Sequence, residues 1–124
     1  MKNIGLLQMK SFLKNPKIRS KKHLNFLKQL NCVRCGRSPC DPHHLKSGTD
    51  SGMATKSGDN WVIPVCHEHH MEIHQKGERT FFSDIDSAKA LAQKLYEITA
   101  NSKGDYTLDE MIRGCELVAE FRRG

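Results

Sequence analysis

The sequence has 124 residues, of which 37% are hydrophobic and 27% charged, a composition typical of one small globular domain. No apolar run approaches the roughly 20 residues that a membrane-spanning helix needs. The N-terminal stretch also lacks the small-residue cleavage site of a signal peptide. We therefore expect a cytoplasmic protein that binds no membrane. In that reducing compartment, metal ligands or buried thiols are a better interpretation of the five cysteines than disulfides.

Positive charge is concentrated at the N-terminal end. The first 37 residues hold ten Lys or Arg and no Asp or Glu, whereas the other 87 hold ten basic and fourteen acidic residues. Such a segment is typical of a surface that binds a polyanion such as nucleic acid, because each phosphate that it neutralises releases counterions and so favours binding. The alternative is a solvated basic arm that only keeps the protein soluble. The candidate nucleic-acid contacts, which include two lysines of a later glycine-containing loop, are Lys17, Arg19, Lys21, Lys22, Lys46 and Lys56.

The chain divides into a basic arm and one domain. Residues 1–19 are predicted to form a poorly ordered arm, and residues 20–124 the domain. Ser20 is expected to cap a short helix that carries leucines at three-residue spacing. Residues 31–76 contain nearly all of the metal-ligand side chains, and residues 86–122 form a helical extension.

Two amphipathic helices are predicted in that extension, where they serve as a scaffold. The first covers about residues 86–100. The second begins at Thr107, which can form a capping box with Glu110. Its apolar side chains are expected to be buried: Leu108, Met111, Ile112, Cys115 and Val118.

Two short motifs predict a structural zinc site. The stretch "NCVRCG" places two cysteines two residues apart on a tight turn, as in a zinc knuckle. In "VCHEHH" a cysteine and a histidine repeat the gap, and at helical spacing they share one face. The predicted ligands are Cys32, Cys35, Cys66 and His69. Cys40 lies close enough in sequence to be a rival ligand.

The remaining histidines indicate a second metal site. His70 and His74 lie four residues apart on a neighbouring face of the same predicted helix. A third ligand is expected from the pair His43 and His44 in "DPHHLKSG". In an extended segment these two side chains point to opposite sides. One can therefore coordinate the metal ion while the other faces the molecule bound to that ion. Three imidazoles with open positions are typical of a catalytic metal. The alternative is that the pair are surface histidines, or that one is simply another ligand.

These motifs together resemble those of the HNH, or ββα-metal, endonucleases. The resemblance lies in "DPHHLKSG", "DNWVIPVC" and "HEHHMEIHQKGE", and "HHMEIHQKG" is also similar to the metal-binding helix of nuclease colicins. Within this family the sequence most resembles the phage Ref-type recombination-associated nucleases, through "CVRCG", "DPHH", "GMATKSGD" and "HQKGERTFF". The resemblance implies an α+β fold with a ββα-metal core. Its hairpin would cover residues 41–65 and its helix residues 66–76, flanked by one N-terminal and two C-terminal helices.

The same resemblance implies a role for each site residue. His43 takes the place of a metal ligand together with His70 and His74, and His44 takes that of the general base. Asn60 takes the place of the family's middle Asn, which orients the base. Because Asn60 lies one residue further from the metal helix than that pattern has it, neighbouring Asp59 is the alternative, and an ordinary turn residue is another.

The function that follows is a metal-dependent DNA endonuclease. The resemblance implies hydrolysis of phosphodiester bonds with one divalent cation (Mg²⁺, Mn²⁺, Zn²⁺ or Ni²⁺), beside the structural zinc. The expected partners are single- or double-stranded DNA and recombination proteins, and the expected setting is the bacterial host cytoplasm of a phage-derived monomer. The alternative function is a non-catalytic zinc-containing module that binds nucleic acid. That module has no need of His44.

Overall fold

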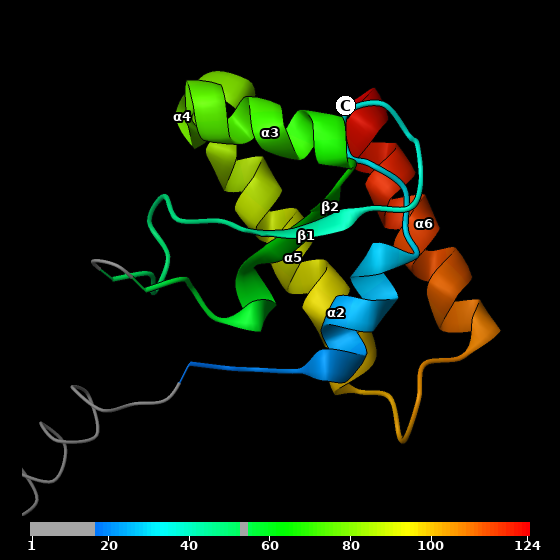
Figure 1. Cartoon of the computed structure of the whole chain (residues 1–124). Helices are drawn as coiled ribbons and strands as arrows, with labels where there is room; N and C mark the ends of the chain where they lie inside the picture. Colours follow the sequence, from blue (N-terminus) through cyan, green and yellow to red (C-terminus); the bar gives the residue numbers. More distant parts are fainter. Residues whose placement is uncertain (1–16, 53–54) are drawn as a thin grey trace, which may run out of the picture.

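A computed structural model of the chain describes residues 17–52 and 55–124. Within these residues the fold is mixed α+β, with a two-stranded antiparallel hairpin and five α-helices (Figure 1). No helix in this part of the chain is long and apolar enough to cross a membrane. The elements in chain order are α2 (Lys21–Lys28), β1 (Asp41–His44), the 3-10 helix η1 (Asp59–Trp61), β2 (Val62–Val65), α3 (His67–Lys76), α4 (Glu78–Phe81), α5 (Ile85–Ala100) and α6 (Leu108–Arg123).

The hairpin forms within the range that the family resemblance implied. Asp41 pairs with Val65, and His44 at the other end of β1 pairs with Val62. All four residues of β2 are buried, because helices α3 and α5 both contact this strand (Figure 1). In β1, which is more polar, His43 is the only buried residue of the four. The hairpin therefore places a buried histidine beside α3.

Helix α3 begins one residue later than predicted. Cys66 is its N-cap and has an extended backbone, so the helix proper starts at His67. The helix ends at Gly77, whose φ of 89° is a conformation that glycine adopts at little cost. The short helix α4, which was not predicted, follows at once and brings Glu78 back toward the hairpin.

The predicted helix caps are confirmed. The Ser20 hydroxyl accepts a hydrogen bond from the backbone N–H of His23 at 3.1 Å and starts α2. Thr107 and Glu110 form the predicted capping box at the start of α6. Helix α5 begins at Ile85, one residue earlier than predicted, with Asp84 as its cap. Local hydrogen bonding therefore sets these helix ends, as the side-chain pattern indicated.

The prediction that α6 buries Leu108 and Ile112 is wrong. Leu108 is 75% exposed and Ile112 50% exposed. The helix instead turns Gly114 and Val118 inward, and Phe26 of α2 lies directly against Gly114. Because a glycine lets another element approach closely, this contact leaves Leu108 and Ile112 on the solvent side, while Met111 and Cys115 are partly buried against the core.

The last three residues of the predicted arm are part of the fold. Residues 1–16 of the arm lie outside the described residues. Lys17, Ile18 and Arg19 are hydrogen-bonded to residues 55–59, just before β2. They therefore belong to the folded domain.

Candidate functional site

Three cysteines and one histidine come together at the start of α3. Their ligand atoms all lie within 4.8 Å of one another, and the four are Cys32, Cys35, Cys66 and His69. The Sγ atoms of Cys35 and Cys66 are 3.7 Å apart, and Cys32 Sγ lies 3.6 Å from Nδ1 of His69. In tetrahedral zinc sites, sulfur ligands lie roughly 3.8 Å from each other and roughly 3.6 Å from a nitrogen ligand. This cluster fits a zinc ion, as the spacing predicted.

The Arg37 guanidinium favours the thiolate form of Cys35 that a zinc ion needs, whereas burial raises the pKa of the Cys66 thiol. Burial disfavours ionisation of Cys35, but hydrogen bonds from Arg37 outweigh it and lower the pKa of the thiol to about 6. The Arg37 Nε atom lies 3.2 Å from Cys35 Sγ. The backbone N–H of Arg34 points at Cys32 Sγ from 3.4 Å. Cys40, the rival ligand, lies outside the cluster; its thiol donates to the Arg37 carbonyl, and burial raises its pKa to about 12.

A second cluster joins strand β1 to the next two turns of α3. It consists of His43, His70 and His74, whose ligand nitrogens also lie within 4.8 Å of one another. The Nε2 atoms of His70 and His74 are 3.2 Å apart. Two nitrogen ligands of one tetrahedral zinc lie roughly 3.3 Å apart. Adjacent residues His69 and His70 thus serve two different clusters from one helix.

A buried carboxylate orients His43. Glu78 Oε2 lies 2.8 Å from Nε2 of His43, and both side chains are less than 8% exposed. Burial disfavours the Glu78 carboxylate, but hydrogen bonds from His43 and from the backbone N–H groups of Ser47 and Lys46 lower its pKa to about 2. The ionised carboxylate only accepts, so Nε2 carries the hydrogen and Nδ1 is left with a free lone pair.

Asp41 plays the same part for His70. Its Oδ2 atom lies 3.2 Å from Nδ1 of His70 and 3.2 Å from Nδ1 of His67. Burial raises the pKa of Asp41, but these two hydrogen bonds outweigh it and the pKa falls. Nδ1 of His70 is therefore the donor and Nε2 points toward His74. His67 itself is 81% exposed and lies outside both clusters.

His44, the proposed base, pairs with Asp59 rather than with Asn60. Its Nε2 atom lies 2.8 Å from Oδ1 of Asp59, which is 2% exposed. Burial opposes ionisation of Asp59, but the hydrogen bonds from His44 and the Ser20 N–H lower its pKa. Burial lowers the pKa of His44, which favours the neutral imidazole. Asn60 Oδ1 is buried with no hydrogen-bond partner among the described residues. Asp59, the alternative to Asn60, is therefore the residue that holds the His44 ring.

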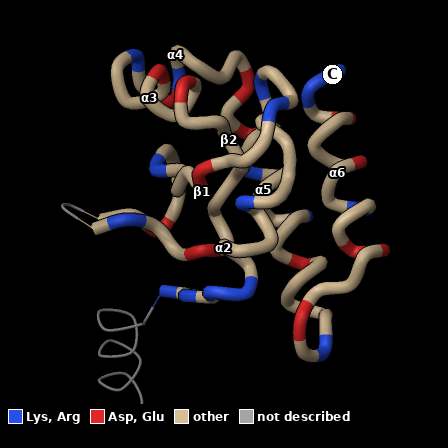
Figure 2. The backbone as a smooth tube through the Cα atoms, turned by 45° about the vertical axis from the view of Figure 1, so that its right-hand side comes forward, with Lys and Arg blue, Asp and Glu red and all other residues tan. Residues whose placement is uncertain are grey.

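The predicted nucleic-acid contacts fall into two groups. Lys17 and Arg19 bond to residues 55–59, and Lys22 donates to the carbonyls of Ser102 and Gly104 in the turn before α6. Figure 2 shows blue basic segments at the described N-terminal end and in the loop between the strands. The members of the second group are exposed: Lys21, Lys46 and Lys56.

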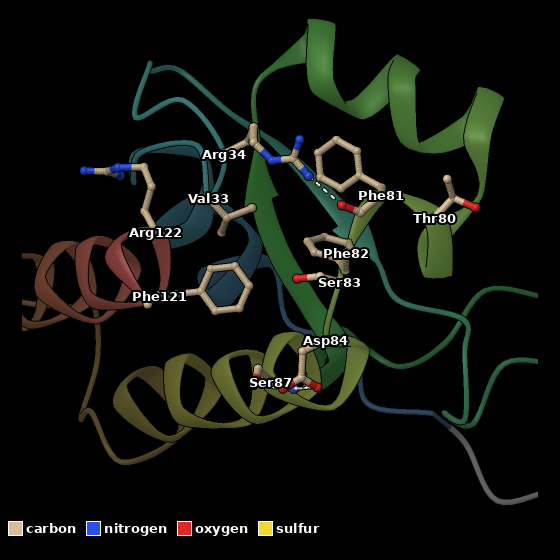
Figure 3. A pocket seen from close by; sticks show the side chains of 11 residues that line it. Val33, Arg34, Thr80, Phe81, Phe82, Ser83, Asp84, Ser87, Phe121 and Arg122 are labelled. Atoms are coloured by element: carbon tan, nitrogen blue, oxygen red, sulfur yellow. Dashed lines mark hydrogen bonds between the residues drawn. The ribbon is translucent and has the colours of Figure 1, made fainter.

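A pocket of about 530 Å³ borders the cysteine cluster, and Val33 and Arg34 of the turn between Cys32 and Cys35 line it (Figure 3). Phe81, Phe82 and Phe121 form its apolar wall, and Arg34 lies over the Phe81 ring at 3.9 Å. None of its lining residues belongs to either ligand cluster or to the His44–Asp59 pair. The candidate chemistry therefore does not lie in this pocket.

Comparison with known proteins identifies the family. The family described as "Protein of unknown function (DUF968)" matches residues 7–98. The chain belongs to the DUF968 family. The matched DUF968 region contains all seven residues of the two clusters and both members of the His44–Asp59 pair. The match is to DUF968 and not to an HNH family, so the relation to HNH nucleases is a proposal.

One curated relative is similar over half of the chain. It is the uncharacterized protein YdfU of Escherichia coli (strain K12), 42% identical over 67 residues, which make up 52% of this chain. The matched part spans only 19% of YdfU. No solved structure matches the chain.

Proposed function

We propose that this DUF968 domain is a metal-dependent DNA endonuclease of the HNH, or ββα-metal, type. One observation carries the proposal. Three imidazoles come together at His43 of strand β1, and the next residue of that strand, His44, is hydrogen-bonded to the buried Asp59 carboxylate. A structural zinc site explains only the cysteine cluster. A binding module needs neither the second cluster nor the His44–Asp59 pair.

His43, His70 and His74 would hold one divalent cation. Bound there, the cation would neutralise charge that develops on the scissile phosphate and on the departing oxygen. Three neutral nitrogens suit Zn²⁺, Ni²⁺ or Mn²⁺ better than Mg²⁺, which prefers oxygen ligands. Two of the three rings have their second nitrogen bonded to a carboxylate, the usual support of a histidine ligand.

His44 is the group that takes a proton. Because Asp59 accepts from Nε2, the neutral ring presents Nδ1 as its basic nitrogen. Nδ1 removes a proton from the attacking water, the new P–O bond forms and the bond to the 3′ oxygen breaks. The departing 3′ oxygen takes a proton from a solvent water, so the products are a 5′ phosphate and a 3′ hydroxyl. The imidazolium that forms is stabilised by the Asp59 carboxylate at 2.8 Å.

Nicking of supercoiled DNA tests this function. The full chain should nick the plasmid with at least one of Mg²⁺, Mn²⁺, Ni²⁺ or Zn²⁺, and EDTA should stop the reaction. His44→Ala should lower the rate by roughly 10²- to 10⁴-fold with DNA affinity and metal content unchanged, the usual loss when a positioned base is removed. His70→Ala should lose activity together with the second metal ion, because two ligands hold an open site poorly.

The matched control is Gln75→Ala, an exposed residue of α3 outside both clusters. It should nick like the parent. If His44→Ala also nicks like the parent, the base is another group. If the parent cleaves neither supercoiled nor single-stranded DNA with any of the four ions, the zinc-containing binding module is the better interpretation.

A further inference from the structure

The segment before α2 is built into the wall of the proposed active site. Lys17 Nζ donates to the Thr55 hydroxyl at 2.9 Å and to the Lys56 carbonyl at 2.8 Å. The backbone N–H of Asp59 donates to the Ile18 carbonyl at 2.7 Å. Two parts of the chain about forty residues apart in sequence are therefore tied together beside His44.

Asp59 receives bonds from both sides of this contact. Its Oδ1 atom lies 2.8 Å from His44 Nε2 and 3.4 Å from Arg19 Nη1. Its Oδ2 atom accepts the backbone N–H of Ser20 at 2.7 Å. The hydrogen bonds from Arg19 and Ser20 fix the rotation of this buried carboxylate. The carboxylate in turn fixes the direction of the His44 ring.

Arg19 also fixes the backbone that carries Asp59. Its Nη1 atom donates to the Ser57 carbonyl at 2.6 Å, and Nη2 lies 3.4 Å from the Lys56 carbonyl. A guanidinium presents several donors in one plane, so it can bond to two carbonyls and a carboxylate at once. Lysine cannot reproduce that arrangement.

We propose that Arg19 is a positioning residue for the cleavage reaction, acting on His44 through Asp59. This inference rests on the proposed nuclease function. It changes the interpretation of Arg19, which the sequence alone placed among the phosphate contacts. A phosphate contact strengthens DNA binding, whereas a positioning residue raises the rate in the bound complex.

Steady-state nicking by the full chain separates the two roles. Arg19→Ala should lower kcat by about 3- to 10-fold with KM unchanged, the loss expected for one or two hydrogen bonds. Lys21→Ala, which removes an exposed charge two residues away, should instead raise KM. Arg19→Lys should recover only part of kcat. Zinc content and the melting temperature of each variant check that the domain is folded.

A double-mutant cycle tests whether Arg19 acts through Asp59. Asp59→Asn should lower kcat, and adding Arg19→Ala to it should cost little more, because the two changes break one linkage. The inference is overturned if the two losses in kcat multiply, or if Arg19→Ala changes KM alone. If the parent never nicks DNA, the nuclease function is refuted instead. If the parent nicks DNA and the Arg19→Ala variant has the same kcat, only the role of Arg19 is refuted.

Discussion

Three carboxylates decide which ring nitrogen is left free on His43, His44 and His70. Glu78 holds Nε2 of His43, Asp41 holds Nδ1 of His70 and Asp59 holds Nε2 of His44. A neutral imidazole has one donor nitrogen and one acceptor nitrogen, so an ionised carboxylate on one side leaves a lone pair on the other. Under the proposed function, the lone pairs of His43 and His70 would face the metal ion and that of His44 would accept a proton. Because His43 and His44 keep the same nitrogen free, it is their opposite directions on strand β1, and not the carboxylates, that separate ligand from base.

These carboxylates were harder to predict than the histidines they hold. The histidines have helical or strand spacing that can be read from the sequence, whereas Glu78 lies 35 residues from His43. Only a fold that turns the chain at Gly77 brings them together. Asp59 was the alternative to Asn60 because Asn60 lies one residue further from α3 than the family pattern has it. Both residues belong to the 3-10 helix η1, and only the fold shows that Asp59 is the one that contacts His44.

At the same scale, His23 should make folding sensitive to acid. This histidine is fully buried; Thr99 contacts its Nδ1 at 2.8 Å, and Nε2 has no hydrogen-bond partner among the described residues. Burial lowers its pKa from 6.5 to about 4, although the charge of Asp59 acts in the other direction. The unfolded chain therefore takes up this proton below pH 6.5, while the folded chain does not until about pH 4.

Stability is consequently full above pH 6.5 and falls as the pH drops toward 4. The loss from this residue is roughly 3 kcal/mol, from about 1.4 kcal/mol per pKa unit. The free energy of unfolding, measured by urea titration between pH 7 and 4.5, should fall less steeply in His23→Gln than in the parent. Zinc release in acid affects both proteins alike. Equal slopes would mean that His23 is protonated in the folded state.

At the scale of elements, one helix organises both metal clusters. The first turn of α3 contributes His69 to the cysteine cluster, and the next two turns contribute His70 and His74 to the other. The helical period predicted this division from the sequence. It did not predict α4, because four residues after a glycine carry too little periodicity to reveal a helix.

Helix α6 shows why an apolar stripe does not define a buried face. Its stripe includes Leu108 and Ile112, but the face that packs is centred on Gly114 and Val118. A glycine adds nothing to a hydrophobic pattern, yet it decides here where Phe26 can approach. The side-chain pattern predicted the helix and its capping box, and the docking angle depended on a contact between distant elements.

Gly114→Ala should therefore destabilise the domain. A Cβ atom at this position would lie 2.7 Å from Phe26 Cζ and 3.1 Å from Leu30 Cδ2, both much closer than van der Waals contact. We expect a loss of about 1–3 kcal/mol from overpacking, partly offset by the better helix propensity of alanine, worth about 1 kcal/mol. Urea denaturation measures it, with exposed Arg113→Ala on the same helix as the control. If Gly114→Ala is as stable as the parent, α6 does not pack closely against Phe26 and Leu30 at this position.

At the scale of the whole molecule, the cysteine cluster joins the turn after α2 to the start of α3. Cys32 and Cys35 follow α2, while Cys66 and His69 lie at the start of α3, so one ion would cross-link the N-terminal half to the metal helix. The hairpin that carries His43 and His44 lies between these two attachments in sequence. The shape of the proposed active site therefore depends on the structural metal.

Removing the zinc should consequently unfold the domain rather than loosen one loop. In comparable small domains zinc contributes on the order of 10 kcal/mol of apparent binding free energy, which is as large as the total stability of such a fold. Cys32→Ala should give a protein that lacks zinc and is unfolded or aggregated, as judged by metal analysis and circular dichroism. Cys115→Ala, a change on α6 outside the cluster, should keep one tightly bound zinc ion and the parent's spectrum. A folded Cys32→Ala protein with undiminished zinc content would mean that the ion binds elsewhere and that the hydrophobic core is stable without this cluster.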